Sequence, residues 1–248
     1  MQKIAVLSDI HGNIAALEKV MADMQHRGVD AVFNLGDHVS GPLWPKETIV
    51  MLMAQDWFQI RGNHDRELAM TAADRHGASD RYAYARLDEI EVRWLGALPT
   101  TLTLDNEFLL CHGTPSSDVT TLLETIEHGR ARISSPVEVR ARLDGVDFPV
   151  MVCGHTHFPR VVSLPGGQLI INPGSVGLPA YDYDVPSAHV IETGSPHARY
   201  AVMERKPEGW TIDLIAVPYD HQLAADQACK NGRPDWEEGL LTGYMVGE

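Results

Sequence analysis

The chain has 248 residues, of which 44% are hydrophobic and 22% are charged, and its formal net charge is −14 at pH 7. This composition is typical of a globular protein and excludes disordered, low-complexity and fibrous classes. The longest apolar run covers only residues 49–54, whereas a helix that crosses a bilayer needs about 20 apolar residues, and the acidic balance disfavours non-specific binding of nucleic acids.

The N-terminus and the cysteines indicate a cytoplasmic protein. Lys3 is followed by only four apolar residues, which is too short for the apolar segment of a secretory signal. The three cysteines, Cys111, Cys153 and Cys229, are odd in number and lack C-x-x-C spacing. This predicts reduced thiols that act as small buried apolar residues, and it disfavours a disulfide framework and a thiolate zinc site.

The first half of the chain alternates short apolar runs with amphipathic stretches, which is the pattern of β-α-β units and a largely parallel sheet. Strands are predicted over residues 4–8, 31–35 and 57–60. The first helix is expected between an N-cap at Asn13 and a stop at Gly28, and the second over residues 46–55 with Pro45 in its first turn. Residues 80–94 are expected to form a third helix.

The second half changes character after Pro99, where paired strands are predicted over residues 100–104 and 108–111. Helices are expected over residues 119–127 and 136–143. Short strands are expected over residues 150–153, 161–164, 169–171, 200–204 and 210–216, before a polar helical tail that starts near Asp220. No repeat or long linker divides the sequence, so we expect one domain over residues 1–248, with two sheets packed face to face and covered by helices.

Nearly every predicted strand is followed at once by a cluster of Asp, His or Asn residues with glycine. The clusters are Asp9-Ile10-His11-Gly12-Asn13, Gly36-Asp37, Gly62-Asn63-His64-Asp65, His112-Gly113, Gly154-His155-Thr156-His157 and Asn172-Pro173-Gly174-Ser175. In open α/β sheets, ligands bind outside the carboxyl ends of the strands, where such loops converge. We therefore expect one crowded polar site.

The side chains in these clusters suit metal ions. The candidate ligands are Asp9, His11, Asp37, Asn63, His112, His155 and His157. Oxygen and imidazole nitrogen without thiolate favour manganese, iron, zinc, cobalt or nickel. The set is too large for one tetrahedral ion, whereas two ions that share a carboxylate would use all of it. Such a pair activates a bridging water and neutralises the oxygens of a phosphoryl transition state.

Each histidine also has a purely structural interpretation, because a single histidine after a strand is most often a capping or hydrogen-bonded residue. The recurrence of these clusters behind separate strands is what favours the metal site. For His38 and His189 a structural role is favoured. Five histidines follow no strand and are expected at the surface: His26, His76, His128, His197 and His221.

The set of motifs in this order resembles the calcineurin-like metallophosphoesterases. The resemblance covers roughly residues 1–179, and the segment Asn172-Pro173-Gly174-Ser175-Val176-Gly177 is similar to the one that often ends the core in small prokaryotic members. It implies an α/β fold built as a four-layer α/β/β/α sandwich of two mixed sheets flanked by helices, with a dinuclear metal site at one edge.

The resemblance also implies how the ligands divide between two divalent transition-metal ions. Asp9, His11, Asp37 and His157 would hold one ion. Asp37, Asn63, His112 and His155 would hold the other, so that Asp37 bridges the two. Manganese is the first expectation for both ions, with iron, zinc, cobalt and nickel as alternatives.

His64 lies next to the ligand Asn63 but is not itself assigned to a metal. Its expected role is to donate a proton to the oxygen of the leaving group, with Asp65 orienting the imidazole. Asn13 is expected to support the first loop or to contact substrate, and His38 stands in a loop that is expected to line the substrate pocket.

Two segments depart from the compact family pattern. Residues 180–199 look like an insertion, either a lid or a plain extension. The tail motif Asn231-Gly232-Arg233-Pro234-Asp235-Trp236 is similar to a segment near the C-terminus of some members, but no chemistry follows from it.

The leading functional hypothesis is a metal-dependent phosphoesterase that hydrolyses a phosphodiester or phosphoanhydride of a small, nucleotide-like molecule. The alternatives are a serine/threonine protein phosphatase, a non-catalytic scaffold on the same fold and a nuclease that acts on DNA ends. We expect a small phosphate ester as partner, and neither a membrane nor a stably bound nucleic acid. The oligomeric state stays open.

Overall fold

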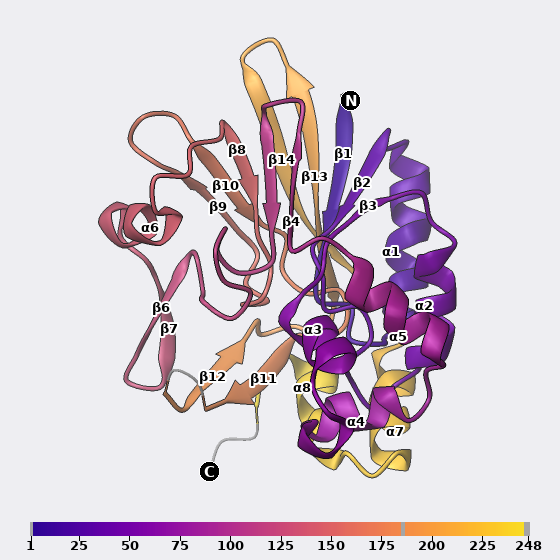
Figure 1. Cartoon of the computed structure of the whole chain (residues 1–248). Coiled ribbons are helices and arrows are strands. Elements are labelled where there is room, and N and C mark those ends of the chain that lie inside the picture. Colours follow the sequence, from indigo (N-terminus) through magenta and orange to yellow (C-terminus); the bar gives the residue numbers. More distant parts are fainter. Residues whose placement is uncertain (1, 185–186, 246–248) are drawn as a thin grey trace.

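The computed structural model describes residues 2–184 and 187–245, and two five-stranded sheets form its centre (Figure 1). In spatial order, the first sheet contains β14 (Gly209–Val217), β13 (Ala198–Lys206), β1 (Lys3–Leu7), β2 (Ala31–Asn34) and β3 (Phe58–Gln59). β1, β2 and β3 run parallel, whereas β13 is antiparallel to β1 and to β14.

The second sheet repeats this plan with its parallel strands in the middle. In spatial order it contains β4 (Thr101–Leu104), β5 (Phe108–Cys111), β8 (Val150–Val152), β10 (Leu169–Asn172) and β9 (Arg160–Ser163). β5, β8 and β10 are parallel, and the edge strands β4 and β9 are antiparallel to their neighbours. The parallel strands of each sheet therefore end at a common edge.

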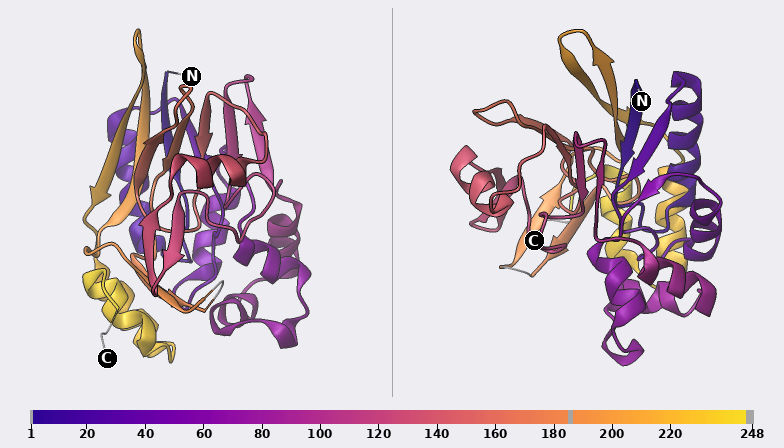
Figure 2. Two further views of the ribbon diagram at one scale, coloured as in Figure 1. Left: turned by 90° about the vertical axis from the view of Figure 1, so that its left-hand side faces the viewer. Right: turned by 45° about the horizontal axis from the view of Figure 1, so that its top comes forward.

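The central strands β1 and β2 of the first sheet are buried on both faces, and their successive side chains point to opposite sides. Ile4 and Val6 of β1 pack with Phe108 and Leu110 of β5 between the two sheets. The intervening residues of β1, Ala5 and Leu7, pack in the layer of helices outside the first sheet. Figure 2 shows the two stacked sheets with helices on both outer sides. This arrangement confirms the predicted four-layer sandwich.

The helices lie mostly outside the first sheet and around the edge at which the parallel strands end (Figure 1). The helices are α1 (Ile14–Arg27), α2 (Pro45–Met53), α3 (Asn63–Met70), α4 (Ala78–Tyr84), α5 (Glu89–Ala97), α6 (Pro136–Leu143), α7 (His221–Lys230) and α8 (Glu237–Thr242), with short 3-10 turns η1 (Ala73–Arg75) and η2 (Pro234–Trp236). No helix among the described residues is long and apolar enough to cross a membrane.

Two predicted helices are wrong. The helix expected over residues 80–94 is two helices, because Asp88 caps a new one with its side chain and accepts hydrogen bonds from the backbone N–H groups of Ile90 and Glu91. The helix expected over residues 119–127 is a turn followed by β6 (Glu124–Glu127), which pairs with β7 (Arg130–Ile133) in a hairpin. Pairing with a neighbouring strand overrides local helical spacing there.

This hairpin belongs to a third sheet that the sequence did not indicate. The sheet contains β11 (Ala180–Tyr183), β12 (His189–Glu192), β7 and β6 in spatial order. The expected insertion over residues 180–199 thus begins with an antiparallel pair of strands, β11 and β12, while residues 185 and 186 lie outside the described residues.

The predicted limits of the first helix are confirmed. Gly28 ends α1 with a left-handed φ of 64°, and the side chain of Asn13 accepts a hydrogen bond from the backbone N–H of Ala16 as the N-cap. Asn13 is fully buried. Its Nδ2 donates to the carbonyl oxygen of Gly177 at 3.0 Å and to the hydroxyl of Tyr219 at 3.1 Å. Asn13 therefore ties the first loop to two distant segments.

Replacing Asn13 by alanine is expected to lower the free energy of unfolding by about 2–4 kcal/mol, because it removes both a helix cap and the partners of buried polar groups. Urea unfolding measures this loss. The matched control is Asp220→Ala, which removes only the exposed cap of α7 and is expected to cost about 0.5–2 kcal/mol. Equal losses in the two variants would contradict a supporting role for Asn13.

Candidate metal centre

Side chains that follow four parallel strands meet at the common edge of the two sheets. Ligand atoms of Asp9, His11 and His157 all lie within 4.8 Å of one another, and so do those of Asp9, Asp37 and His112. All five residues are buried. Asp9 belongs to both groups, so in the structure Asp9 joins the two sets of candidate ligands, and the bridge at Asp37 stays a prediction.

The backbone is unusual at these positions. Asp9, His11, Asp37, His155 and His157 have φ angles of 56°, 51°, 56°, 68° and 58°. Residues other than glycine seldom adopt this left-handed conformation, which costs on the order of 1–3 kcal/mol and is concentrated at functional sites. The strained backbone is therefore found at the residues whose side chains are candidate ligands.

Glycines let these loops approach one another closely. A Cβ atom on Gly62 would lie 2.2 Å from Oδ1 of Asp37, and one on Gly154 would lie 2.0 Å from Oγ of Ser8 and 2.9 Å from Oδ2 of Asp9. No side chain fits at either position without moving the candidate ligands.

Three imidazoles are held in one orientation by backbone carbonyl groups. The Nδ1 atoms of His11, His112 and His157 lie 2.7, 2.7 and 2.6 Å from the carbonyl oxygens of Ser40, Leu35 and Leu178. Because a carbonyl oxygen only accepts, each Nδ1 carries a proton, and the neutral ring then presents the lone pair of Nε2. This is how proteins orient metal-binding histidines.

The inward-facing atoms lack protein partners of the right kind. Nε2 of His11 lies 3.3 Å from Nε2 of His157, and two neutral rings would direct lone pairs at each other. Oδ1 of Asp9 is buried without a hydrogen-bond partner, 3.3 Å from Nε2 of His157. A cation between these atoms would satisfy all three. The donor set therefore fits a metal ion of the class that prefers imidazole and carboxylate.

The electrostatics of the site lead to the same conclusion. Burial opposes ionisation of Asp9, but His157 and His112 hold its pKa at about 2. Burial also opposes a charge on His112, yet Asp37 and Asp9 raise its pKa to about 10. Burial lowers the pKa of His11 to about 4, which keeps that ring neutral. Two buried carboxylates thus attract positive charge into the centre, and His112 supplies part of it while His11 stays neutral.

The two remaining candidate ligands, Asn63 and His155, lie near His112 of the second group. Oδ1 of Asn63 lies 3.0 Å from Nε2 of His112, which in turn lies 3.3 Å from Oδ2 of Asp37. His155 is partly exposed, its ring lies 5.3 Å from that of His112, and its Nε2 contacts the carbonyl oxygen of Val119 at 3.1 Å. His155 is thus in the same site but outside the two tight groups.

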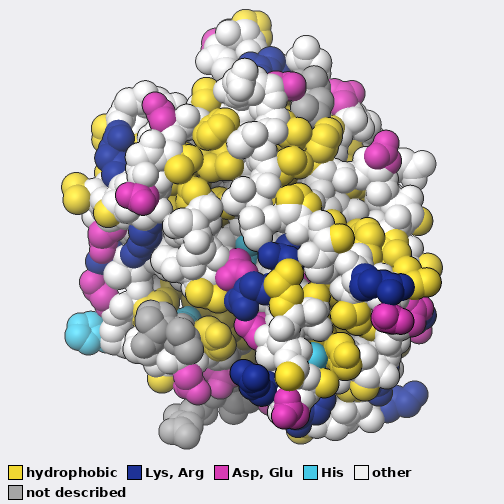
Figure 3. All heavy atoms as spheres, in the orientation of Figure 1, with side chains coloured by type: hydrophobic (Ala, Val, Ile, Leu, Met, Phe, Trp, Pro, Cys, Tyr) yellow, Lys and Arg dark blue, Asp and Glu magenta, His cyan; other side chains and the backbone are white. Residues whose placement is uncertain are grey.

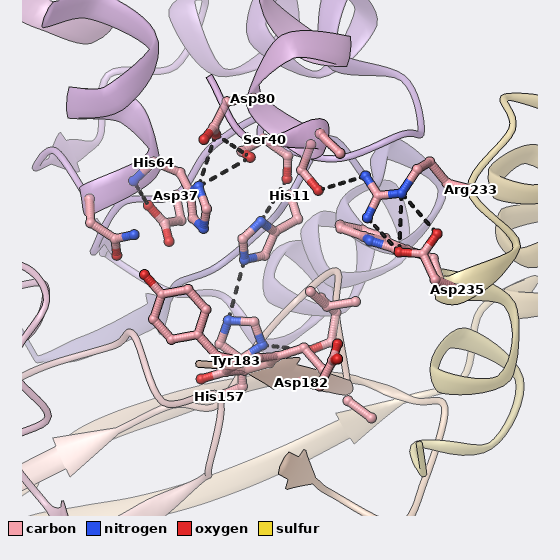
Figure 4. A pocket seen from close by; sticks show the side chains of 18 of the residues that line it. His11, Asp37, Ser40, His64, Asp80, His157, Asp182, Tyr183, Arg233 and Asp235 are labelled. Carbon is pink, nitrogen blue, oxygen red and sulfur yellow. Dashed lines mark hydrogen bonds and ion pairs between the residues drawn. The ribbon is translucent and has the colours of Figure 1, made fainter. Parts of the chain in front are cut away.

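His64 lies beside this centre and is anchored at two points (Figure 4). Its backbone N–H donates to Oδ1 of Asp37 at 2.9 Å, and its Nδ1 donates to Oδ1 of Asp80 at 2.9 Å. The hydroxyl of Ser40 donates to the same oxygen of Asp80 at 2.6 Å. Burial lowers the pKa of His64, but Asp37 and Asp80 outweigh it and raise the pKa to about 9.

The prediction that Asp65 orients His64 is wrong. Asp65 stands in the first turn of α3, where its carboxylate turns back to accept a hydrogen bond from the backbone N–H of Gly62. It also accepts from the backbone N–H groups of Asp37 and His38 and from Nδ1 of His38 at 2.7 Å. Asp65 therefore shapes the loop that carries Asp37, and Asp80 takes the place next to His64.

Sequence reasoning missed Asp80, which appeared only as the start of a predicted helix. No motif surrounds it, and its partner His64 is 16 residues away. Packing of α4 against α3 supplies that carboxylate from elsewhere in the chain.

The remaining histidines have structural or surface positions. His38 is fully buried between Asp65 and Gln59 and does not line the cavity, so the structure gives it no place for contact with substrate. His189 is buried, and its Nδ1 donates to the carbonyl oxygen of Ser187. The prediction that His76 lies at the surface is wrong, since it is 3% exposed and its Nε2 contacts the carbonyl oxygens of Glu67 in α3 and of Thr71 directly after that helix. The other four of that group are at least partly exposed.

A cavity of about 230 Å³ opens over the centre. The loops that carry the candidate ligands line this cavity together with His64, α4, β11 and the C-terminal segment, with Ser79, Tyr183, Arg233 and Trp236 among the side chains. The C-terminal tail motif, which suggested no chemistry by itself, thus forms part of the wall of the site.

Comparison with known proteins agrees with this geometry. A model of the calcineurin-like phosphoesterase superfamily domain matches residues 2–195. An uncharacterised protein of Methanocaldococcus jannaschii is 26% identical over 255 residues, which cover 94% of each chain.

Two crystal structures share the fold of the whole chain. A metallophosphoesterase from Sphaerobacter thermophilus has a TM-score of 0.75 at 24% identity, over 98% of this chain and 99% of that one. A hypothetical protein from Pyrococcus horikoshii OT3 has a TM-score of 0.76 at 20% identity, over 99% and 100% of the two chains. Because the family model spans most of the sequence, the chain belongs to the calcineurin-like phosphoesterase superfamily.

Proposed function

We propose that this protein is a metal-dependent hydrolase of small phosphodiesters or phosphoanhydrides that binds two divalent transition-metal ions, manganese first among them. The observation that carries the proposal is that five candidate ligands converge on one buried space: Asp9, His11, Asp37, His112 and His157. Oδ1 of Asp9 has no hydrogen-bond partner in that space. Membership of a superfamily of phosphoesterases supports the same class of reaction.

The protein side chains divide the work between binding and proton transfer. When bound, a pair of divalent ions supplies positive charge for the phosphoryl oxygens and lowers the pKa of water, so that a nucleophile forms at neutral pH. Asp9, His11, Asp37, Asn63, His112, His155 and His157 would hold these ions. The buried carbonyl groups that fix the imidazoles keep that geometry rigid, and a rigid site aligns the reacting groups.

His64 is the general acid in this proposal. Its Nδ1 is held by Asp80, so Nε2 is left to give a proton to the oxygen of the leaving group. Burial lowers the pKa of this imidazole, but Asp37 and Asp80 raise it to about 9 before any metal ion is bound, and the bond to Asp80 favours the protonated ring. Asp80 acts through His64 by fixing the orientation of its ring, and Ser40 in turn fixes Asp80.

The shape and charge of the molecule favour a small substrate over a macromolecule. The cavity volume of about 230 Å³ is below the usual range of about 300–1,000 Å³ for small-molecule sites, and the net charge is −14. Figure 3 shows Lys and Arg side chains next to Asp and Glu side chains on the face that it displays, with no continuous basic groove among the described residues of that face. These features disfavour nucleic acids and protein phosphatase substrates.

The proposal predicts metal-dependent hydrolysis with a preference for diesters. Protein stripped with a chelator and then supplied with Mn²⁺ is expected to hydrolyse bis(4-nitrophenyl) phosphate, with a higher kcat/KM than for 4-nitrophenyl phosphate. Stripped protein is expected to release no nitrophenol above background, because the carboxylates and imidazoles alone supply no nucleophile.

An Asp37→Ala variant treated in the same way is the control, since it removes a carboxylate from the centre. Undiminished turnover without metal would refute the proposed chemistry. Hydrolysis of 4-nitrophenyl phosphate alone would contradict the proposed diesterase activity and indicate a phosphatase that acts on monoesters.

Substitutions at His64 and Asp80 test the route of the proton. His64→Ala is expected to lower kcat about 10²- to 10⁴-fold while metal content stays unchanged, because the ring is not a metal ligand. Asp80→Asn is expected to lower kcat by about 10- to 100-fold, since it loosens the orientation of His64. Steady-state kinetics with elemental analysis measures both effects.

The matched control is Asp220→Asn, an exposed cap at which asparagine serves nearly as well as aspartate. If Asp80→Asn behaves like Asp220→Asn, then Asp80 does not position the general acid.

A further inference from the structure

The cavity extends from the candidate metal centre to a wall built by the C-terminal segment. Figure 4 shows Arg233 and Asp235 at one end of the cavity and Asp37 and His64 at the other. Among the described residues that line the cavity, Arg233 is the one lysine or arginine. Neither the metal site nor the proposed proton transfer uses it.

Arg233 is rigidly held. Its Nε and Nη2 donate to the carboxylate of Asp235 at 2.8 and 2.5 Å, and its Nη1 donates to Oγ of Ser79 at 3.0 Å. The guanidinium carbon lies 5.7 Å from the centre of the Trp236 ring, and 19% of the side chain is exposed. A guanidinium has five N–H groups, so these contacts leave two N–H groups that can bind a ligand.

Arg233 lies where the leaving group of a bound substrate would reach it. Ser79, which contacts Arg233, is adjacent in α4 to Asp80, which holds His64. The Trp236 ring that lies against Arg233 is also 6.1 Å from the ring of the candidate metal ligand His11. A substrate with its scissile phosphate at the centre and its leaving group at His64 therefore extends toward Arg233.

We propose that Arg233 binds an anionic oxygen group on the leaving group of the substrate. This inference rests on the proposed function and narrows its substrate class to phosphate esters or anhydrides whose leaving group carries a second phosphate or a carboxylate. The planar fork of a guanidinium matches the paired oxygens of both groups.

Asp235 orients the guanidinium of Arg233 and still leaves it able to bind an anion. Its side chain is 55% exposed, so water screens its charge, while its two oxygens fix the plane of the guanidinium. The side chain of Arg233 is thus already ordered before a ligand binds, and this preorganisation lowers the entropy cost of binding.

A matched pair of substrates tests the proposal. The pair is an alkanediol bisphosphate and the corresponding hydroxyalkyl phosphate, used as a series of increasing chain length, or as methyl diesters at the scissile phosphate if the enzyme prefers diesters. Phosphorus NMR follows hydrolysis by the Mn²⁺-loaded enzyme. A carboxyalkyl phosphate of the same length distinguishes a site for carboxylate from one for phosphate.

The readout is the ratio of kcat/KM values within a pair. At the best chain length, wild type is expected to prefer the compound with the second anion by about tenfold or more, the strength of a charge-assisted bidentate contact. Arg233→Gln is expected to abolish this preference, and Arg233→Lys to retain part of it because the charge remains but the fork is lost. The control Arg93→Gln, at an arginine on α5 with 65% side-chain exposure, is expected to keep the full preference.

The outcomes separate this proposal from the one on which it rests. If wild type hydrolyses both compounds without preference, or if Arg233→Gln keeps the preference, Arg233 is not an anion site. A preference of Arg233→Lys equal to that of wild type would reduce the role of Arg233 to its charge and overturn the bidentate contact. If wild type with Mn²⁺ hydrolyses none of these esters and no nitrophenyl ester, the proposed function itself fails.

Discussion

Two carboxylates buried in one small space are the constraint on which this structure depends. Asp9 and Asp37 are almost wholly removed from water, and two negative charges in a medium of low dielectric constant repel each other strongly. Protonated imidazoles meet part of this demand, as the raised pKa of His112 shows. Divalent cations would meet it fully, and they would also relieve the facing Nε2 atoms of His11 and His157.

The fold brings the two carboxylates together by repeating one structural unit, a parallel strand followed by a loop with polar side chains. Parallel strands in two stacked sheets end at one edge, and the loops after β1, β2 and β8 carry candidate ligands in a left-handed backbone conformation. Because these loops belong to strands of both sheets, the centre forms only where the two sheets are stacked with these strand ends together. Around it, Asp65 fixes the loop of Asp37, and Asp80 fixes the ring of His64.

Much of the fold and of the candidate site could be predicted from the sequence, because the signals are local. Strand, turn and polar cluster follow one another directly, so the residues at the strand ends indicate where the candidate ligands lie. Asp80 could not be predicted, because only the packing of α4 brings it to His64. Proximity in sequence pointed to Asp65 instead, whose carboxylate the helix turns away.

The third sheet and the C-terminal wall escaped prediction for the same reason. β6 and β7 are short, and they are defined as strands only by their pairing with each other and by the pairing of β7 with β12. Arg233 lies in a motif without chemistry of its own, and its place in the cavity follows from the contact with Ser79, which is 154 residues away in sequence. Long-range packing thus supplies the features that set the proposed specificity.

Crystals grown with Mn²⁺ and measured at the manganese absorption edge test the central claim most directly. We expect two anomalous peaks about 3.5–4 Å apart, one among Asp9, His11 and His157 and the other among Asp37, Asn63 and His112. The absence of manganese from this edge of the sheets at full saturation, with the carboxylates still facing protonated imidazoles, would contradict the account.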